Sequence, residues 1–450
     1  MTMSRHHLDR SMGSQICGLA SSSDNAWNVN FNSGNVNYND RDNHNRALAV
    51  CRPVPASESQ GVTYKELYKA LIKARHGKVA SINQMRFDHR WMDGLLDLQQ
   101  AINDHTWSPR KTTCFIATHP KAREIHAPDF ADRVVHHWLV PKLEEIYEPT
   151  FIFDSFANRK GKGSHKAVKR LRDFVCQVYS GQGSGWYLQL DIKNYFVSLH
   201  RPTLYKMLKA RMSKLDLPEH VQRVAHALLR QSAAQQGVIH CSTPAERARV
   251  PAYKRLENAA PGCGLPIGNL TSQFFANVYL DRLDQFMKRE LRVERYIRYV
   301  DDFVIVHRDR AVLEGLLEKI RAFLRDELRL ELKNDIRLRP LDSGIDFLGY
   351  VVYPTHTRVR KRVLSHANEA LDAWQAQRIR NGIASATPAD YRSLEAIWAS
   401  YCGHLKHASS HRLQQRILAR NPWLQTLTST KRRFSHQLEG RRVHIKVRTT

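Results

Sequence analysis

The sequence lacks paired cysteines, long apolar runs and an excess of acidic residues. Its seven cysteines are scattered and never form a Cys-x-x-Cys pair, which argues against a disulfide framework and against a zinc site. We therefore expect free thiols in a reducing cytoplasm. No apolar stretch approaches the roughly 20 residues of a membrane-spanning helix, and the polar residues 1–10 do not resemble a signal peptide. These absences predict a cytoplasmic protein without a membrane partner.

Acidic residues are few relative to basic ones. Lys and Arg number 70 against 43 Asp and Glu, which gives a formal net charge of +27. Such an excess attracts polyanions, so nucleic acid is the first candidate partner and an acidic membrane surface is the competing one. The 450 residues, 42% of them hydrophobic, are sufficient for a core and for two or three domains. Charge alone does not separate a polymerase from a nuclease or a ribosomal protein.

The chain is predicted to divide into residues 1–60, 61–355 and 356–450. The first part is rich in asparagine, with nine between Asn25 and Asn45, and asparagine favours turns over helix or strand interiors. We expect a poorly ordered tail there, although the alternation from Trp27 to Val36 is compatible with short strands.

Regular structure is predicted to begin near Thr63, because Thr63 and Glu66 have the spacing of a capping box. Apolar periodicity predicts helices over 87–104, 131–147, 164–179, 201–212, 218–231, 270–289 and 311–327. It predicts strands as a pair within 110–130, at 187–191, as a hairpin over 295–307, and at 329–339 and 343–353, followed by a basic helical region from about 360. This alternation is typical of an α+β fold.

Two adjacent aspartates, Asp301 and Asp302, lie between apolar segments. At a hairpin tip their carboxylates would project beyond the sheet, where oxygen ligands can hold a hard divalent cation. An ordinary solvated acidic turn is the alternative for the pair by itself. A third carboxylate, Asp191, ends the apolar segment from Leu188, where burial without a partner would be costly; a helix N-cap is its alternative. Three such carboxylates brought together would form a two-metal site.

Several motifs resemble, in order, those of reverse transcriptases. Tyr299–Asp302 is similar to their YxDD box, and Asp191–Phe196 is similar to the preceding aspartate box. Further similar blocks are Lys121–Ile125, Asp132–Val135, Ser155–Gly163, Leu332–Lys333 and Phe347–Tyr350. The resemblance covers roughly residues 62–420. It implies a right-hand polymerase with fingers and palm in 61–355 and a basic helical thumb and tail in 356–450.

The resemblance also implies the chemistry, which is RNA-directed addition of deoxynucleotides to a primer. The implied catalytic residues are Asp191, Asp301 and Asp302, and with Ile192 they would hold two Mg²⁺ ions, for which Mn²⁺ can substitute. The implied substrate-binding residues are Lys121 and Arg123 at the triphosphate, Phe196 as a gate against the ribose 2′-hydroxyl, and Ile267, Gly268, Gln273 and Lys333.

One block indicates a subtype. Ile267-Gly268-x-x-x-Ser272-Gln273 resembles the signature of diversity-generating retroelement reverse transcriptases, a branch of the group II intron-like family. Ile267 stands where most relatives have glutamine, which would loosen base selection and favour errors at adenines; neutral drift at a packing position is the alternative. The implied partners are template RNA, cDNA, deoxynucleoside triphosphates and a small basic accessory protein that forms a ring.

The asparagine-rich head is similar to the variable tail of the lectin-like proteins that such elements diversify. We hypothesise that residues 20–55 are a template repeat translated in frame; an ordinary asparagine-rich tail is the alternative.

The histidines at 126, 136 and 137 lack zinc-cage spacing and a nearby cysteine in sequence, so we interpret them as packing or phosphate-contacting residues. The basic runs 358–362, 431–433 and 441–442 are interpreted as contacts to nucleic-acid phosphates rather than as solvated faces alone.

Three other functions remain open. A group II intron reverse transcriptase would carry a longer region after the palm, and an antiviral reverse transcriptase would lack the Ile267–Gln273 signature. A non-catalytic RNA-binding scaffold would not need the three aspartates.

Overall fold

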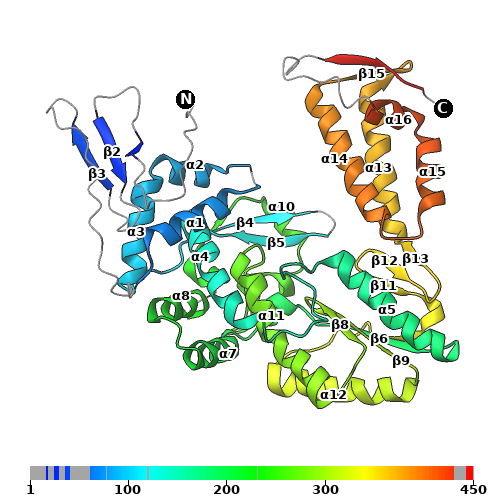
Figure 1. The fold of residues 1–450 in the computed structure, drawn as a ribbon, viewed down its shortest axis with the longest axis horizontal. Coiled ribbons are helices and arrows are strands. Elements are labelled where there is room, and N and C mark those ends of the chain that lie inside the picture. The colour runs from blue at the N-terminus through cyan, green and yellow to red at the C-terminus, as the bar shows by residue number, and fades with distance from the viewer. Residues whose placement is uncertain are drawn as a thin grey trace, which may run out of the picture. The chain divides into compact units, whose positions relative to one another are not determined.

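The computed structural model describes residues 61–77, 79–118, 121–230, 232–429 and 442–448, together with the backbone of three short strands before them (Figure 1). The chain forms two compact units that alternate along the sequence. Unit 1 comprises Met1–Phe151, Asn194–Arg282 and Glu327–Leu330, and unit 2 comprises Ile152–Lys193, Leu283–Asp326 and Glu331–Thr450. The domain division predicted at residues 60 and 355 stays a prediction.

The asparagine-rich head contains a small antiparallel sheet of β1 (Cys17–Gly18), β2 (Asn25–Val29) and β3 (Val36–Asp40). In its register Trp27 lies opposite Tyr38, which agrees with the strands that the alternation allowed. The rest of the head, and with it the expected poor order and most of the hypothetical repeat, lies outside the described residues.

The first long helix of unit 1 begins at the predicted capping box. Thr63 Oγ1 accepts a hydrogen bond from Glu66 N at 3.3 Å, and Glu66 Oε2 accepts one from Thr63 N at 2.9 Å, so two backbone donors at the helix start are satisfied. The helices are α1 (Tyr64–Arg75), α2 (Ile82–His89), α3 (Trp91–Asn103), α4 (Phe130–Tyr147), α6 (Tyr195–Ser198), α7 (Arg201–Lys214), α8 (Glu219–Arg230), α9 (Ala233–Gln236), α10 (Pro244–Ala248), the 3₁₀ turns η2 (Ala252–Lys254) and η3 (Leu256–Asn258), and α11 (Leu270–Gln285), whose end belongs to unit 2.

Unit 1 also holds a three-stranded sheet in the order β5-β4-β7. The predicted strand pair within 110–130 is present as β4 (Thr112–Ala117) and β5 (Arg123–Ala127), paired antiparallel. The third strand, β7 (Val238–His240), pairs parallel to β4. Three residues are too few to show alternation in a sequence, which explains why β7 was not predicted.

Unit 2 is built on an antiparallel sheet in the order β10-β6-β9-β8. Its strands are β6 (Trp186–Asp191), β8 (Tyr296–Tyr299), β9 (Asp302–His307) and β10 (Arg337–Pro340). The long helix α5 (Ser164–Gln182) packs on it through a buried cluster that includes Leu171, Val175 and Val304. The helix α12 (Arg310–Leu328) follows β9, and a π-helical turn, η4 (Phe286–Glu290), follows α11.

Among its described residues, the remainder of unit 2 contains two further small sheets and four helices. One sheet joins β11 (Ile345–Phe347), β12 (Tyr350–Val352) and β13 (Thr357–Val359), and the 3₁₀ turn η5 (Leu341–Ser343) precedes it. The other joins β14 (Ile379–Arg380), β15 (Ile383–Ala386) and β16 (Val443–Lys446). The helices are α13 (Lys361–Arg378), α14 (Pro388–Leu405), α15 (His411–Arg420) and α16 (Pro422–Ser429).

Three predictions about secondary structure were wrong. The region after 360 is not helical throughout, because β15 pairs with β16 from near the chain end, and such long-range pairing leaves no local periodicity. The predicted strand 329–339 is reduced to β10 and one bridge between Leu332 and Ile192. The predicted helix 87–104 begins at Trp91, after a separate helix that ends at His89.

No helix among the described residues combines the length and the apolar character that a membrane crossing requires.

Unit 2 contains a fully buried charged pair, Arg298 on β8 and Asp284 at the end of α11. Arg298 Nη2 and Nε donate to the two carboxylate oxygens of Asp284 at 2.5 and 2.8 Å. Tyr296 OH donates to the same carboxylate at 2.7 Å. Arg298 also donates to Ser155 Oγ at 3.1 Å and to Val300 O at 3.0 Å. A buried guanidinium with this many acceptors is fully compensated, so removing it leaves a buried carboxylate without its counter-charge.

We predict that Arg298→Met lowers the free energy of unfolding by about 3–5 kcal/mol, the cost of breaking a buried pair on one side. Urea denaturation followed by fluorescence measures it. The matched control is Arg321→Met, whose pair with Glu318 is exposed (46% and 69% of the side chains) and should contribute less than about 1 kcal/mol. Equal shifts for both variants would contradict the structural role of Arg298.

Candidate active site

Two of the predicted catalytic aspartates are opposite one another in the unit 2 sheet. The register of β6 and β9 pairs Asp191 with Asp302, and that of β8 and β9 pairs Tyr299 with Asp302. Directly paired residues of neighbouring strands project from the same face of a sheet. The apolar strands carry both carboxylates to one end of the sheet, because each aspartate stands at a strand terminus.

The third aspartate, Asp301, lies in the turn between β8 and β9. Val300 has a φ of 56°, in the left-handed region that non-glycine residues rarely adopt. Arg298 Nη1 donates to Val300 O at 3.0 Å, and Ile192 N donates to Asp301 O at 3.3 Å. These bonds hold the strained turn from both sides and set Asp301 close to the end of β6.

Two polar side chains contact the aspartates directly. Gln189 Nε2 donates to Asp302 Oδ1 at 3.2 Å and to Asp346 O at 3.0 Å. Lys333 Nζ donates to Asp191 Oδ2 at 2.5 Å, and Lys333 N donates to Asp191 O at 2.8 Å. Lys333 therefore lies beside the aspartates, and its charge partly offsets theirs.

The electrostatics of this group favour a bound cation. Burial raises the pKa of Asp302 to about 7; the hydrogen bond from Gln189 lowers it, and the neighbouring charges of Asp191 and Asp301 raise it. Asp191 Oδ1 is buried and has no hydrogen-bond partner. A divalent cation would satisfy that oxygen and relieve the repulsion, so the residues fit a site for Mg²⁺ or Mn²⁺. The side chain of Ile192 is fully buried, so only its main-chain carbonyl could reach a cation.

Unit 1 brings together the expected gate residue and the subtype block. Phe196 lies in α6 and is half-buried. Its carbonyl oxygen accepts a hydrogen bond from Leu265 N at 2.8 Å, and Leu199 O accepts one from Gly264 N at 2.9 Å. The residues just before the subtype block are therefore attached to the Phe196 turn by main-chain bonds, which do not depend on side-chain identity.

The same block presses against β5. Ile267 O accepts a hydrogen bond from His126 N at 2.8 Å. Gly268 has a φ of 119°, and a Cβ built on it would lie 2.9 Å from Ile125 Cγ2 and 3.1 Å from His126 O. Glycine is required at position 268 for both its conformation and its close approach.

The remaining predicted substrate-binding residues are exposed. Lys121 and Arg123 precede and begin β5, and Gln273 lies in the first turn of α11. Their exposure is compatible with binding a ligand from solvent. These three residues belong to unit 1, whereas the aspartates and Lys333 belong to unit 2.

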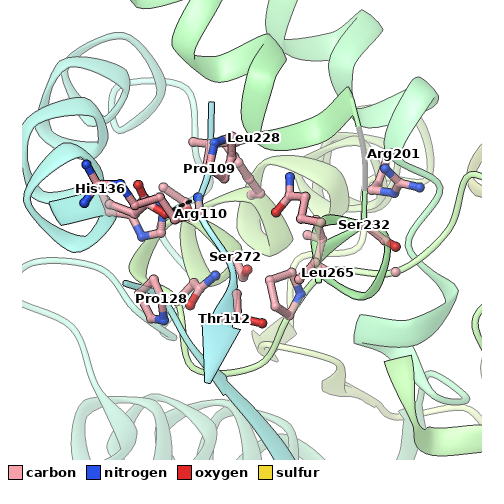
Figure 2. A pocket seen from close by; sticks show the side chains of 18 residues that line it. Pro109, Arg110, Thr112, Pro128, His136, Arg201, Leu228, Ser232, Leu265 and Ser272 are labelled. Atoms are coloured by element: carbon pink, nitrogen blue, oxygen red, sulfur yellow. Dashed lines mark hydrogen bonds between the residues drawn. The ribbon is translucent and has the colours of Figure 1, made fainter. Parts of the chain in front are cut away.

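A cavity of about 30 Å³ lies against the subtype block (Figure 2). Ser272 lines it from the block and Leu265 from the residues just before the block. Arg110, Asp132 and His136 line it from α4 and from the approach to β4. The volume suits about one water molecule, so this face of the block packs against protein. Asp132 Oδ2 accepts a hydrogen bond from Arg110 N at 2.6 Å, yet burial raises the pKa of Asp132 to about 7.

Sequence reasoning missed the residues that support the aspartates. Gln189 was treated only as part of the apolar strand that ends at Asp191. Arg298 was overlooked within the strand that precedes Asp301. A signal was present, since a polar residue two positions before an aspartate on a strand shares its face. Asp284 gave no usable signal, because its pairing with Arg298 joins a helix end to a strand.

Comparison with known sequences gives the family. The sequence model described as reverse transcriptase (RNA-dependent DNA polymerase) matches residues 109–352, more than half of the chain and the whole stretch that bears the aspartates. The chain therefore belongs to the reverse transcriptase family. This membership and the α+β architecture confirm the expected right-hand polymerase fold class.

Similar proteins extend the family picture. Protein YkfC of Escherichia coli (strain K12) is 22% identical over 300 residues, 59% of this chain and 71% of YkfC. The group II intron-encoded protein LtrA of Lactococcus lactis subsp. cremoris is 23% identical over 323 residues, 60% of this chain and 53% of LtrA. The match thus spans about half the length of LtrA.

Among solved structures, telomerase from Candida albicans with a fragment of telomeric RNA is similar with a TM-score of 0.35 and 12% identity, over 64% of this chain and 55% of that one. Apo telomerase from Candida tropicalis, truncated from its C-terminal domain, has a TM-score of 0.41 and 10% identity over 58% of each chain.

We predict that Gly268→Ala destabilises the protein, by about 1–2 kcal/mol for the positive φ and by more where Ile125 and the β5 main chain must move. Chemical denaturation measures the change. Gly315→Ala is the control, and it should have the opposite effect. Position 315 lies within α12, and no atom lies within 4 Å of a new Cβ. This variant should therefore be stabilised by up to about 1 kcal/mol through its higher helix propensity. A Gly268→Ala protein as stable as the original chain would contradict the close approach.

Proposed function

We propose that this chain is an RNA-directed DNA polymerase that copies a template RNA into cDNA by adding deoxynucleotides to a primer 3′-hydroxyl. The observation that carries the proposal is the register of β6 and β9, which sets Asp191 opposite Asp302 at the end of the sheet. The reverse transcriptase family match over the same region supports it.

Asp191, Asp301 and Asp302 would hold two divalent cations, with the carbonyl of Ile192 as a further oxygen ligand. Mg²⁺ is the expected ion, and Mn²⁺ takes the same oxygen ligands. When bound, the two ions supply Lewis acidity for the attacking 3′-hydroxyl and for the leaving pyrophosphate. Gln189 orients Asp302 through its hydrogen bond, and Lys333 orients Asp191.

The proposed contacts to the deoxynucleotide are based on the solvent exposure and the charge of individual side chains. Lys121 and Arg123 are exposed cations on one strand and its approach, and they would grip the triphosphate of the deoxynucleotide. Phe196 would exclude the ribose 2′-hydroxyl by steric contact. Gln273 would complete the nucleotide-binding surface from the first turn of α11.

The template and product are polyanions, and the formal charge of +27 favours their binding. The basic run 358–362 on β13 and the start of α13 would contact phosphates of the duplex. Of the other two basic runs, Arg442 lies just before β16. Residues 431–433 and 441 lie outside the described residues. A small basic accessory protein and a cytoplasmic location complete the proposal.

We predict that Asp302→Asn abolishes primer extension on an RNA template with Mg²⁺. Losing a metal ligand should remove several kcal/mol of charge stabilisation, which corresponds to a rate loss of about a thousandfold or more. Asp342→Asn, an exposed aspartate on η5, is the matched control and should extend primers normally.

Equal extension by the Asp302→Asn protein and the unaltered chain would rule out catalysis by this site. A lack of product from the unaltered chain, when a template RNA and a small basic accessory protein are both supplied, would also rule it out. The latter result would favour a non-catalytic RNA-binding scaffold.

We further propose that the enzyme diversifies sequences by errors at adenines, as the Ile267–Gln273 signature implies. Ile267 lies in a segment held by main-chain bonds to β5 and to the Phe196 turn, so its apolar side chain can change base selection without changing the backbone. The second candidate is a group II intron-type reverse transcriptase, which the similarity to LtrA favours. An antiviral reverse transcriptase is the third.

We predict that the unaltered chain misincorporates mainly opposite template adenines and that Ile267→Gln lowers this error rate about tenfold, which corresponds to about 1.4 kcal/mol of added discrimination. Sequencing of cDNA from one RNA template measures both rates. Ile267→Val, which keeps an apolar side chain, is the control and should retain the errors. Faithful copying by the unaltered chain would assign it to the intron or antiviral relatives.

A further inference from the structure

A row of potential metal ligands crosses the unit 1 sheet. In the β4–β5 register Cys114 lies opposite His126, and in the β4–β7 register the same Cys114 lies opposite His240. Paired residues share a face, so Cys114, His126 and His240 project from one side of the sheet, although His240 is exposed. Glu124 stands two residues before His126 on β5 and therefore points to the same side.

Three of these side chains converge. One donor atom from each of Cys114, Glu124 and His126 lies within 4.8 Å of the other two. All three residues are buried, at 1%, 6% and 3% exposure. In a tetrahedral zinc site, bond lengths of about 2.0–2.3 Å place neighbouring donors roughly 3.3–3.8 Å apart, so a small contraction of this cluster would reach that geometry.

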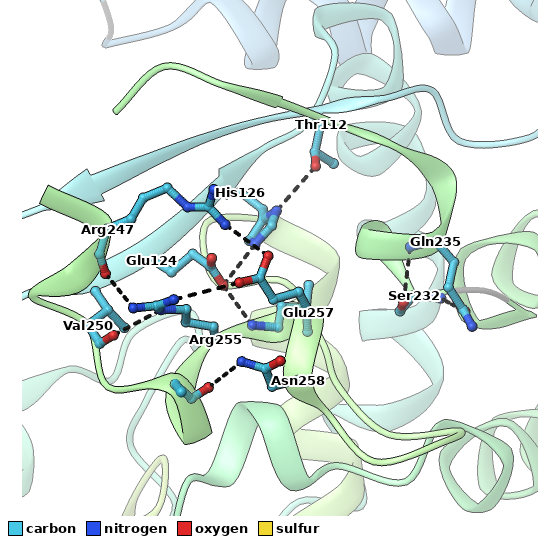
Figure 3. A network of polar contacts seen from close by, with 12 residues as sticks. Thr112, Glu124, His126, Ser232, Gln235, Arg247, Val250, Arg255, Glu257 and Asn258 are labelled. Carbon is cyan, nitrogen blue, oxygen red and sulfur yellow. Dashed lines mark hydrogen bonds and ion pairs between the residues drawn. The ribbon is translucent and has the colours of Figure 1, made fainter. Parts of the chain in front are cut away.

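Outer contacts orient His126 and Glu124 (Figure 3). His126 Nδ1 lies 3.2 Å from Thr112 Oγ1, and donation to that hydroxyl leaves the lone pair on Nε2. His126 Nε2 lies 3.2 Å from Glu124 Oε2, so these two donor atoms face one another and a metal ion between them would replace their direct contact. Glu124 Oε2 accepts a hydrogen bond from Leu256 N at 2.7 Å. A histidine held through its second nitrogen and a carboxylate held by a donor are the usual outer shell of a metal site.

A cavity of about 190 Å³ adjoins the cluster and gives it an open side. Glu124 and His126 line its floor, with Val238 and His240 from β7 and Glu257 from η3. Glu257 is engaged by Arg247 Nη2 at 2.9 Å. The space and the polar lining suit an ordered water beside the three donors.

We propose that Cys114, Glu124 and His126 bind one Zn²⁺ ion, with a water molecule from the cavity as the fourth ligand. The Cys114 thiol releases its proton on binding, so the thiolate and the Glu124 carboxylate balance the two positive charges of the ion. Nitrogen and sulfur donors select zinc over magnesium. The site is separate from the aspartates, which lie in the other unit.

The ion would act as a structural clamp on strand β5. It would join β4 to β5 and, through the Glu124 contact with Leu256, to the segment around η3. β5 begins with Arg123 and bonds to Ile267 O through His126 N, so the clamp would stiffen the strand that carries a predicted triphosphate contact. The competing interpretation is a buried Cys-Glu-His cluster that only packs.

The test uses the full chain freed of metal by a chelator and then titrated with Co²⁺ or Zn²⁺ in excess Mg²⁺, so that the carboxylate site is already occupied. We expect one ion per chain and, with Co²⁺, a thiolate-to-cobalt absorption band. The near-isosteric variants Cys114→Ser and Glu124→Gln should each lose the band or the stoichiometric ion. Thr112→Val should weaken Zn²⁺ affinity 10- to 100-fold, as loss of an outer-shell partner does.

Cys263→Ser, a half-buried thiol in the same unit, is the matched control and should bind metal normally. A second measurement needs no variant: X-ray absorption of the zinc-loaded chain should show one sulfur at about 2.3 Å among nitrogen and oxygen ligands. No bound ion, a cobalt band that survives Cys114→Ser, or a zinc shell without sulfur would each overturn the proposal. None of these readouts depends on polymerase activity.

Discussion

The geometry of the aspartates depends on one buried guanidinium. Arg298 forms hydrogen bonds to three separate elements. It contacts Asp284 at the end of α11, Ser155 in a loop, and the carbonyl of Val300 in the turn that carries Asp301. A charge with 0% exposure is tolerable only with all its acceptors in place. The elements that surround β8 must therefore adopt one arrangement together, and the strained turn is set by that arrangement.

The turn itself has an unfavourable backbone, since Val300 is β-branched and has a positive φ. Strain of this kind persists where surrounding contacts hold it, and it is common at functional sites. Here the holding contacts come from Arg298 on one side and from the main chain of Ile192 on the other. These contacts hold the carboxylates side by side, although burial, together with the repulsion between the carboxylates, raises the pKa of Asp302.

Unit 1 shows a comparable dependence on close backbone contact. The Gly264–Gln273 segment is bound through main-chain groups to the Phe196 turn and to β5, and Gly268 leaves no room for a side chain. Because these bonds use main-chain groups, a different side chain at Ile267 would leave them in place. Within the same signature, the backbone requirement at Gly268 affects stability, whereas the side chain of Ile267 takes no part in these main-chain bonds.

The sequence by itself determined the α+β class, the strands that carry Asp191 and Asp302, and the capping box at Thr63, because these depend on local periodicity and short-range hydrogen bonds. Ordered motifs also determined the family, which the match over residues 109–352 confirms. The roles of the substrate-binding residues remain predictions.

Only the tertiary structure decided which distant residues meet. The scattered cysteines argued against a zinc site, yet a hairpin register sets Cys114 opposite His126, twelve positions further along, and a parallel strand adds His240. Arg298 and Asp284 pair across a helix end and a strand in the same way, and β15 meets β16 from near the end of the chain. Such pairings arise from burial and strand register over long separations, which leave no periodic trace along the chain.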